Sequence, residues 1–327
     1  MTPRERVLAA IEHRQPDFFF NDTGTTERAF KAMVDYTGNP NPYTLFESHL
    51  AGYHVVPMGQ WPSDICYVDA FGVEWDRSRD RDIGIVANRM VTPDNIEEYE
   101  FPSLADFEIP PEDADWGRFR IAHIGFSLFE RAWTLTGMPE LLMAMVDNPA
   151  FAHRLFERVL EYNLRAIALA VTKPVDAMYF GDDWGQQTSL IMGPKLWREF
   201  IKPCLAEMYG AVRKAGKYVV IHSCGKVDEL FPELIELGLN VFNPFQPEVM
   251  DVFEMKRLYG DRLTFYGGIS TQRTLPYGTP EQTREEVLRL IEKVGKNGGY
   301  IAAPAHAIPG DAKPENIMAL IEVLVNQ

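Results

Sequence analysis

A histidine and a cysteine stand two residues apart at the end of an apolar segment, in the stretch Tyr218-Val219-Val220-Ile221-His222-Ser223-Cys224-Gly225. The β-branched residues predict a buried parallel strand, and the polar residues fall where such a strand opens into a loop. In an extended segment this spacing puts both side chains on the same side. An imidazole and a thiol that converge are typical zinc ligands, with a third ligand supplied from elsewhere. On its own, however, such a pair more often marks a buried histidine and an inert cysteine.

The elements that would position this pair alternate regularly along the second part of the chain. We expect strands at 121–125, 176–181, 218–222, 240–244, 262–267 and 299–304, and helices at 138–171, 194–215, 227–238, 250–259, 280–296 and 314–325. This alternation predicts a parallel sheet with crossover helices. Both a (β/α)8 barrel and a doubly wound open sheet fit the pattern.

Other residues able to do chemistry also follow the expected strands. Asp182, Asp183 and Trp184 come after 176–181, Gln246 after 240–244 and His306 after 299–304. Both candidate folds place ligands at the carboxyl ends of strands. We take Asp182 and Asp183 as candidate catalytic or zinc-orienting carboxylates, with helix capping as the alternative, and Trp184 and Gln246 as candidate substrate contacts.

The first part of the chain carries weaker signals. Thr2-Pro3-Arg4-Glu5 predicts a capped helix that stops near Pro16, and Phe18-Phe19-Phe20 predicts a strand. The polar cluster after it makes Asn21 and Asp22 candidate substrate-binding residues, with a plain turn as the alternative. Residues 92–115, rich in Asp, Glu and Pro, indicate an exposed acidic connector.

Two further groups of residues are interpreted as structural. Glu130 and Arg131 lie among aromatic residues in 127–133, and we interpret this segment as a core-facing aromatic pair with a surface ion pair. His49 and His54 lack a partner at ligand spacing, which favours surface or packing histidines.

Composition excludes several classes of function. The net charge of -15 argues against nucleic acid or an anionic membrane as the main partner. Three cysteines form no disulfide framework and fit a reducing interior. The start of the chain is charged, and no apolar run reaches the roughly 18 residues of a membrane span. We therefore expect a cytoplasmic protein.

The motifs together resemble the uroporphyrinogen decarboxylase superfamily, which also contains the zinc-dependent methyltransferases of corrinoid systems. The resemblance rests on five sequence features: the Thr-x-Arg-Glu-Arg helix ending in Pro16-Asp17, Asp69-x-Phe-Gly-Val-Glu-Trp, His222-Ser-Cys-Gly, Phe265-Tyr-Gly-Gly-Ile, and Ala303-Pro-Ala-His-Ala-Ile-Pro with Pro314-Glu-Asn-Ile. It covers nearly the whole chain. It implies one domain over 1–327, an α/β fold of the (β/α)8 TIM type with the cleft at the strand carboxyl ends.

The methyltransferase branch implies a zinc site. Its ligands are a His-x-Cys pair, matched by His222 and Cys224, and a later cysteine in an Ala-Pro-x-Cys segment. His306 stands in place of that cysteine, and imidazole is an equally competent zinc ligand. By this resemblance the chain moves a methyl group between a small molecule, of thiol, methyl ether or methylamine type, and a corrinoid (cobalamin) carried by a partner protein.

The decarboxylase branch is the alternative reading of the same resemblance. Its catalytic carboxylate lies in a Ser-Asp-Ile segment, which Asp64 matches, and it uses no metal. That branch binds substrate carboxylates through an arginine-rich N-terminal segment, whereas here the equivalent stretch holds Arg28 as its only cation. A tetrapyrrole with several carboxylates needs several cations, so uroporphyrinogen is disfavoured. A non-catalytic binding barrel is a third possibility.

Overall fold

The computed structural model describes residues 1–18, 24–45, 48–104, 107–109 and 117–327. Within these residues the main sheet has seven parallel strands in the order β1-β6-β7-β8-β9-β10-β11. They are β1 (Leu50–His54), β6 (Phe119–Ile124), β7 (Ala177–Gly181), β8 (Tyr218–His222), β9 (Val241–Phe245), β10 (Thr264–Ile269) and β11 (Tyr300–Pro304). Neighbours in the sheet follow chain order without a reversal, which excludes the doubly wound alternative.

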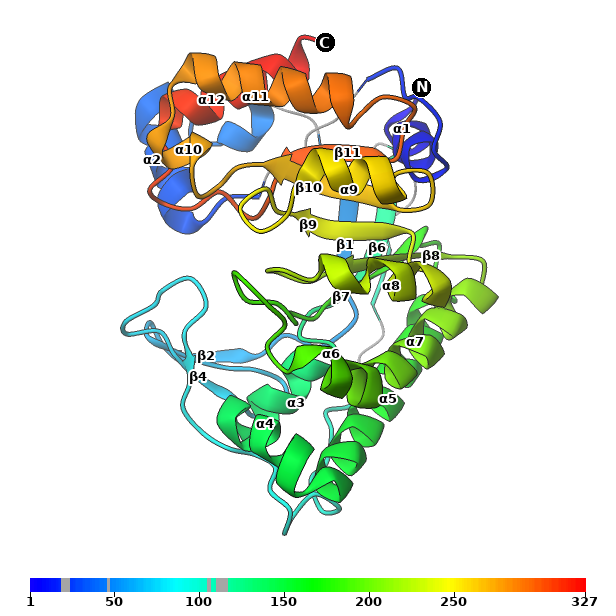
Figure 1. Ribbon diagram of the computed structural model, residues 1–327. Coiled ribbons are helices and arrows are strands. Elements are labelled where there is room, and N and C mark those ends of the chain that lie inside the picture. Colours follow the sequence, from blue (N-terminus) through cyan, green and yellow to red (C-terminus); the bar gives the residue numbers. More distant parts are fainter. Residues whose placement is uncertain (19–23, 46–47, 105–106, 110–116) are drawn as a thin grey trace.

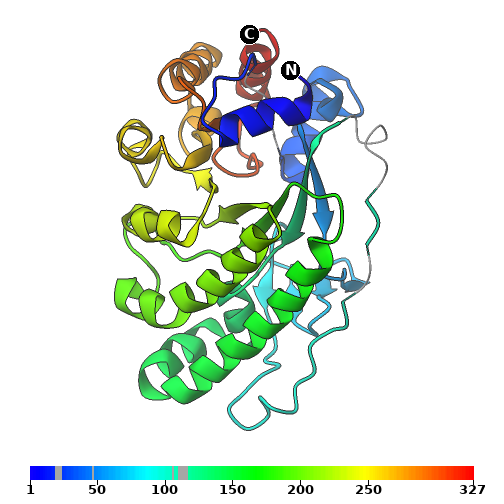
Figure 2. The ribbon, with the colours of Figure 1, turned by 90° about the vertical axis from the view of Figure 1, so that its right-hand side faces the viewer.

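Helices lie outside the curled sheet. They are α1 (Pro3–Ile11), α2 (Glu27–Thr37), α3 (Phe129–Thr136), α4 (Met138–Asp147), α5 (Pro149–Ala170), α6 (Gly193–Leu196), α7 (Lys202–Lys214), α8 (Phe231–Leu237), α9 (Val252–Tyr259), α10 (Thr274–Tyr277), α11 (Pro280–Lys293) and α12 (Pro314–Val325). Figure 2 shows α5, α7, α8, α9 and α11 (green to orange) as an arc around the strands. The expected α/β fold of the TIM type is therefore confirmed.

The sheet has two buried faces with separate cores. One core lies inside the curled sheet and joins alternate residues of the strands, such as Ile121, Val220 and Ile301, to Val7 and Ile11 of α1. The larger core lies between the sheet and the outer helices. Because α1 fills the amino-terminal end of the strands, the opposite end is the one available to a ligand (Figure 1).

A small antiparallel sheet stands beside that open end. It consists of β2 (Gln60–Ser63), β3 (Cys66–Val68), β4 (Glu74–Asp76) and β5 (Ile85–Val86), paired in this order. In Figure 1 the arrowheads of β9 and β10 point toward the side on which β2 and β4 lie, in cyan. The sheet is inserted between β1 and β6, so it belongs to the carboxyl end of β1.

Two expected helices are interrupted for local reasons. The segment expected at 138–171 forms α4 and α5, because Asn148 leaves the helical conformation and accepts a hydrogen bond from the Phe151 amide, starting α5 at Pro149. The segment expected at 194–215 contains a π-helical turn, Trp197–Ile201, before α7. Pro203 lacks the amide hydrogen that a continuous helix would use there.

The structure also bears on the predictions made for the first part of the chain. The capping box of Thr2 and Glu5 starts α1 as expected. Most of the strand expected at 18–20 lies outside the described residues. The connector at 92–115 is anchored in its described part, since Ile96 is buried and the Tyr99 hydroxyl donates to the Phe71 carbonyl. No helix in the described ranges is long and apolar enough to cross a bilayer.

Candidate metal and substrate site

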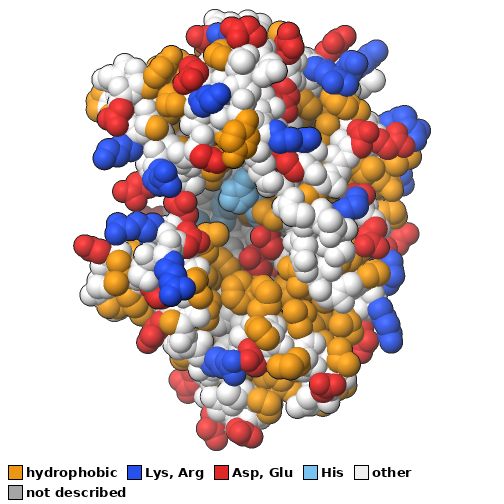
Figure 3. Space-filling view, turned by 60° about the vertical axis from the view of Figure 1, so that its left-hand side comes forward, with side chains coloured by type: hydrophobic (Ala, Val, Ile, Leu, Met, Phe, Trp, Pro, Cys, Tyr) orange, Lys and Arg blue, Asp and Glu red, His pale blue; other side chains and the backbone are white. Residues whose placement is uncertain are grey.

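The ends of two strands bring His222, Cys224 and His306 together. His222 is the last residue of β8, Cys224 follows two residues later, and His306 lies two residues beyond β11. Their ligand atoms all lie within 4.8 Å of one another, and the Cys224 Sγ is 3.3 Å from the His222 Nε2. Figure 3 shows histidine and acidic side chains facing a hollow on this side of the molecule. Two nitrogens and one sulfur suit zinc, and three protein ligands leave a coordination position for a substrate.

A hydrogen-bond network fixes the ring of His222. The side-chain Nδ2 of Asn243 donates to the Tyr266 carbonyl at 3.1 Å, so its Oδ1 must face the imidazole. That Oδ1 lies 2.6 Å from the His222 Nδ1 and also accepts from the Tyr179 hydroxyl at 3.1 Å. Because Oδ1 only accepts, Nδ1 carries the proton and Nε2 keeps its lone pair toward Cys224. Metal-ligating histidines are oriented by partners of this kind, so the residues fit a metal ion.

The other two candidate ligands have shifted proton affinities. Burial, and then the negative charge of Asp183, raises the pKa of the Cys224 thiol well above its usual range. Burial, and then the charge of His222, lowers the pKa of His306 below its usual value. His306 is therefore a neutral imidazole at pH 7. A cation at this position would offset the carboxylate field that disfavours the Cys224 thiolate.

The two aspartates after β7 have different places. Asp182 is fully buried, and its Oδ1 accepts from the amides of Leu128 and Glu130 at 3.1 and 2.8 Å. It therefore caps α3 from a neighbouring strand, and burial raises its pKa to about 6. Asp183 lies at the ligand cluster: its Oδ1 accepts from the Cys224 amide at 2.7 Å and lies 3.8 Å from the His222 Nε2.

Trp184 and Gln246, the two candidate substrate contacts after β7 and β9, differ in their access to a ligand. Trp184 is fully buried and donates its indole N–H to Asp182, so it supports the loop from within the core. Gln246 lines a cavity of about 150 Å³ together with Cys224 and His306. Its Oε1 accepts from the Gly225 amide at 3.2 Å, which holds the loop after β8. Substrate contact by Gln246 fits this position, whereas Trp184 is enclosed by protein.

One other candidate, Asp64, is not brought to the cluster. Asp64 occupies the exposed turn between β2 and β3 and does not line the cavity that contains Cys224, Gln246 and His306. Asn21 and Asp22 lie outside the described residues, so their proposed contact with substrate stays a prediction.

Sequence reasoning missed Glu130, whose carboxyl interacts electrostatically with Asp183 and Cys224. Burial, and then the charges of Asp183 and Asp182, raises its pKa well above the usual value. The expected surface ion pair with Arg131 is wrong, because Arg131 is 5% exposed and forms its ion pair with Asp69 at 2.7 Å. Their position could have indicated a place near the site, since Glu130 and Arg131 both follow the strand expected at 121–125, which is β6.

A second cavity, of about 420 Å³, opens beside the ligand cluster at the ends of β1 and β6. The small sheet forms one wall, and His54 and His123 lie on the wall formed by the barrel strands. The His123 ring is 4.6 Å from the Tyr179 ring, which in turn is 6.2 Å from the His222 ring. The rings of His123, Tyr179 and His222 therefore form a row that leads from this cavity to the ligand cluster. His54, expected to be a surface or packing residue, faces this cavity.

Comparisons with known proteins agree with this arrangement. The chain is 29% identical over 132 residues to the methylcobamide:CoM methyltransferase MtaA of Methanosarcina barkeri, covering 40% of this chain and 36% of that protein. It is 22% identical over 218 residues to a uroporphyrinogen decarboxylase of Hydrogenovibrio crunogenus, covering 63% of this chain and 59% of the relative. Both alignments span less than two thirds of the relative's length.

A solved structure and a family match complete the comparison. The structure titled methyltransferase from Methanosarcina mazei aligns with 100% of this chain and 99% of its own, with a TM-score of 0.70 and 16% sequence identity, which shows a common fold. The family described as uroporphyrinogen decarboxylase (URO-D) matches residues 126–326, more than half of the chain. The chain therefore belongs to the uroporphyrinogen decarboxylase family.

Proposed function

We propose that this chain is a zinc-dependent methyltransferase that moves a methyl group between a small molecule and a corrinoid carried by a partner protein. The observation that carries the proposal is the convergence of His222, Cys224 and His306 within 4.8 Å at the open end of the barrel. The name of the Methanosarcina barkeri relative, a methylcobamide:CoM methyltransferase, supports the same chemistry. The 3.8 Å distance between the Asp183 Oδ1 and the His222 Nε2 supports a role for Asp183 as a fourth ligand or as a group that orients His222.

The protein's own groups have definable roles in such a reaction. When bound, zinc would supply Lewis acidity to the heteroatom that gives up or accepts the methyl group. Asn243 holds the His222 ring so that Nε2 faces the ligand cluster. Glu130, whose pKa lies well above the usual carboxyl value, keeps its proton to higher pH and is available as an acid for a heteroatom that loses a methyl group.

A metal-free decarboxylase is the second candidate, favoured by the decarboxylase named among the relatives. That reading places the catalytic carboxylate on Asp64. In the structure Asp64 lies in an exposed turn and lines neither cavity at the strand ends. Geometry therefore favours the methyltransferase.

Metal analysis with matched variants tests the proposal. Protein purified without chelator should carry about one zinc per chain, and His222→Ala, Cys224→Ser and His306→Ala should each lose it. The controls are Cys204→Ser, a buried cysteine in α7, and His153→Ala, an exposed histidine in α5 that stacks on Phe200. Both should retain zinc.

Methyl transfer to a free cobalamin should follow the zinc content of each variant. If the protein takes up no zinc even after reconstitution, the methyltransferase proposal is wrong. Loss of decarboxylase activity in Asp64→Asn would then support the alternative.

A further inference from the structure

The 420 Å³ cavity beside the ligand cluster has an unusual wall. Five aromatic side chains line it, from the small sheet and the loop after β6: Trp61, Tyr67, Phe71, Trp75 and Phe126. Trp61 and Tyr67 lie 5.0 Å apart by ring centroid, and Trp75 meets Phe126 edge to face at 5.2 Å. Its volume is within the range of cavities that hold small organic ligands.

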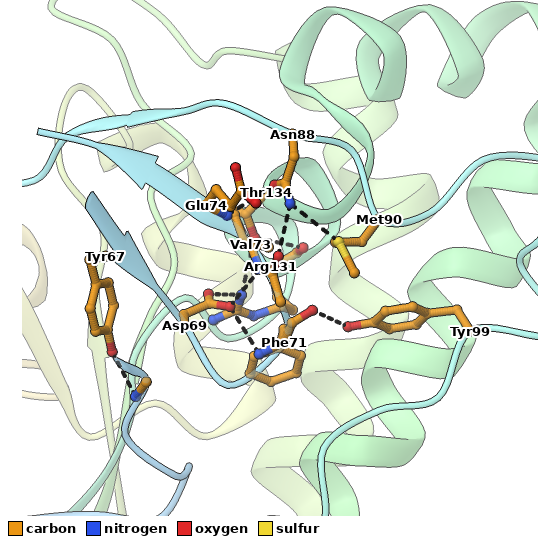
Figure 4. Close-up of polar contacts among 12 residues, drawn as sticks. Tyr67, Asp69, Phe71, Val73, Glu74, Asn88, Met90, Tyr99, Arg131 and Thr134 are labelled. Atoms are coloured by element: carbon orange, nitrogen blue, oxygen red, sulfur yellow. Dashed lines mark hydrogen bonds and ion pairs between the residues drawn. The ribbon is translucent and has the colours of Figure 1, made fainter. Parts of the chain in front are cut away.

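Two arginines and two aspartates supply the charge of this wall. Arg131 donates to the Asp69 carboxylate at 2.7 Å, and its guanidinium lies 3.7 Å from the Phe71 ring centre (Figure 4). Arg77 lies over the Trp61 ring at 4.8 Å and donates to the Asp82 backbone carbonyl at 3.1 Å. The two arginines and the two aspartates cancel in formal charge.

This balance decides which ligands fit. Neither a quaternary ammonium ion, which aromatic walls attract, nor a sulfonate or carboxylate finds a net opposite charge here, because the two guanidinium groups are matched by Asp69 and Asp82. A neutral aromatic ring brings no charge that must be removed from water, and it gains edge-to-face contacts with the aromatic wall.

The position of the cavity relates it to the reaction. His123 lines it and lies one ring, that of Tyr179, away from His222. A substrate whose body occupies the cavity therefore lies beside the ligand cluster.

We propose that this cavity binds the ring of a neutral aryl methyl ether and directs its methoxy group toward His222, Cys224 and His306. The inference rests on the proposed function and names its substrate class. It concerns binding alone, so it is measurable without zinc or a corrinoid.

Gly125 provides a direct way to fill the cavity. It follows β6 and lines the cavity, and a Cβ built on it would meet no atom within 4 Å. Its φ lies outside the left-handed region, so a larger side chain is accommodated without backbone strain. Gly125→Leu should therefore occupy the ligand's space. Gly210→Leu is the matched control, since Gly210 is exposed on α7 and equally open.

The test measures equilibrium binding by calorimetry and by tryptophan fluorescence. Fluorescence reports on this cavity because Trp61 and Trp75 line it. The probes are 2-methoxyphenol, tetramethylammonium and 2-mercaptoethanesulfonate. We expect saturable binding of 2-methoxyphenol that Gly125→Leu weakens at least tenfold and Gly210→Leu changes less than twofold. Trp61→Ala, a substitution at an exposed strand, should weaken it severalfold without unfolding the protein.

The outcomes separate this inference from the proposed function. Binding of 2-methoxyphenol by the zinc-free His222→Ala variant, with the same sensitivity to Gly125→Leu, supports the cavity assignment whether or not the enzyme holds zinc. Tighter binding of either charged probe would overturn it, as would binding of 2-methoxyphenol that Gly125→Leu leaves unchanged.

Discussion

The two halves of the barrel's open end are built in different ways. At β8, β9 and β11, short polar side chains are held by hydrogen bonds from neighbouring strands, as in the contact between His222 and Asn243. At β1 and β6, an inserted small sheet supplies aromatic side chains around a buried ion pair between Arg131 and Asp69.

This difference separates two tasks. The polar half provides electron-pair donors in a fixed geometry, which a metal requires and which depends on angles and tautomers. The aromatic half provides shape and an apolar surface, which decide what ligand is accepted. Changes in one half should therefore leave the task of the other half largely intact.

Breaking the ion pair of the aromatic half should have the largest effect on stability. Arg131→Met leaves the Asp69 carboxylate, 11% exposed, without its partner. We expect a loss of about 3 kcal/mol in the free energy of unfolding, measured by urea titration. Zinc content of the folded protein should stay unchanged.

Arg154→Met is the control for this substitution. Arg154 pairs with Glu97 and Glu157, which are both exposed, so its loss should cost at most about 1 kcal/mol. Equal losses in the two variants would show that the ion pair does not hold the aromatic half together.

The polar half is tested by the partner of His222. Asn243→Ala removes the acceptor that fixes the ring, and zinc affinity should fall about 10- to 100-fold in a chelator competition assay. Asn240→Ala removes an asparagine immediately before the same strand, where its Oδ1 accepts from the Val219 amide. If both variants lose affinity equally, the effect is one of stability rather than orientation.

A smaller effect concerns pH. Burial lowers the pKa of His123 to about 4, so the folded protein holds this ring neutral. The unfolded chain takes up a proton at its ordinary pKa of about 6.5. Stability associated with neutral His123 is thus complete above pH 6.5 and is lost as the pH falls from 6.5 through 4.

His123→Phe should reduce this acid sensitivity. Between pH 7 and 5 the variant should lose about 2 kcal/mol less than the wild type in urea titrations. His54, whose charge also lowers the pKa of His123, is present in both proteins. Parallel pH profiles for the two proteins would contradict the prediction.

The polar half was the more predictable from sequence. Its strands are apolar runs that end in polar residues, and all parallel strands end at one edge, so polar side chains were expected to gather there. That His222, Cys224 and His306 form one metal site was implied by the family resemblance. The capping of α3 by Asp182 was less accessible, because it joins two strand ends 54 residues apart.

The aromatic half was hidden from sequence reasoning. Strands β2 to β5 contain two to four residues each, and β2 is exposed throughout, so no alternation marks them. The buried pair of Asp69 and Arg131 spans 62 residues, and nothing in the local sequence links them. Position after a strand was a usable signal for Glu130 and Arg131, but the adjacency of the acid and the base suggested a surface pair.

The most direct test of the central claim is the X-ray absorption spectrum of the zinc protein. The account predicts one sulfur at about 2.3 Å and at least two imidazole nitrogens at about 2.0–2.1 Å. Cys224→Ser should remove the sulfur shell, and Cys204→Ser should leave the spectrum unchanged. A zinc shell without sulfur in the wild-type protein, or one with two sulfurs, would contradict ligation by His222, Cys224 and His306.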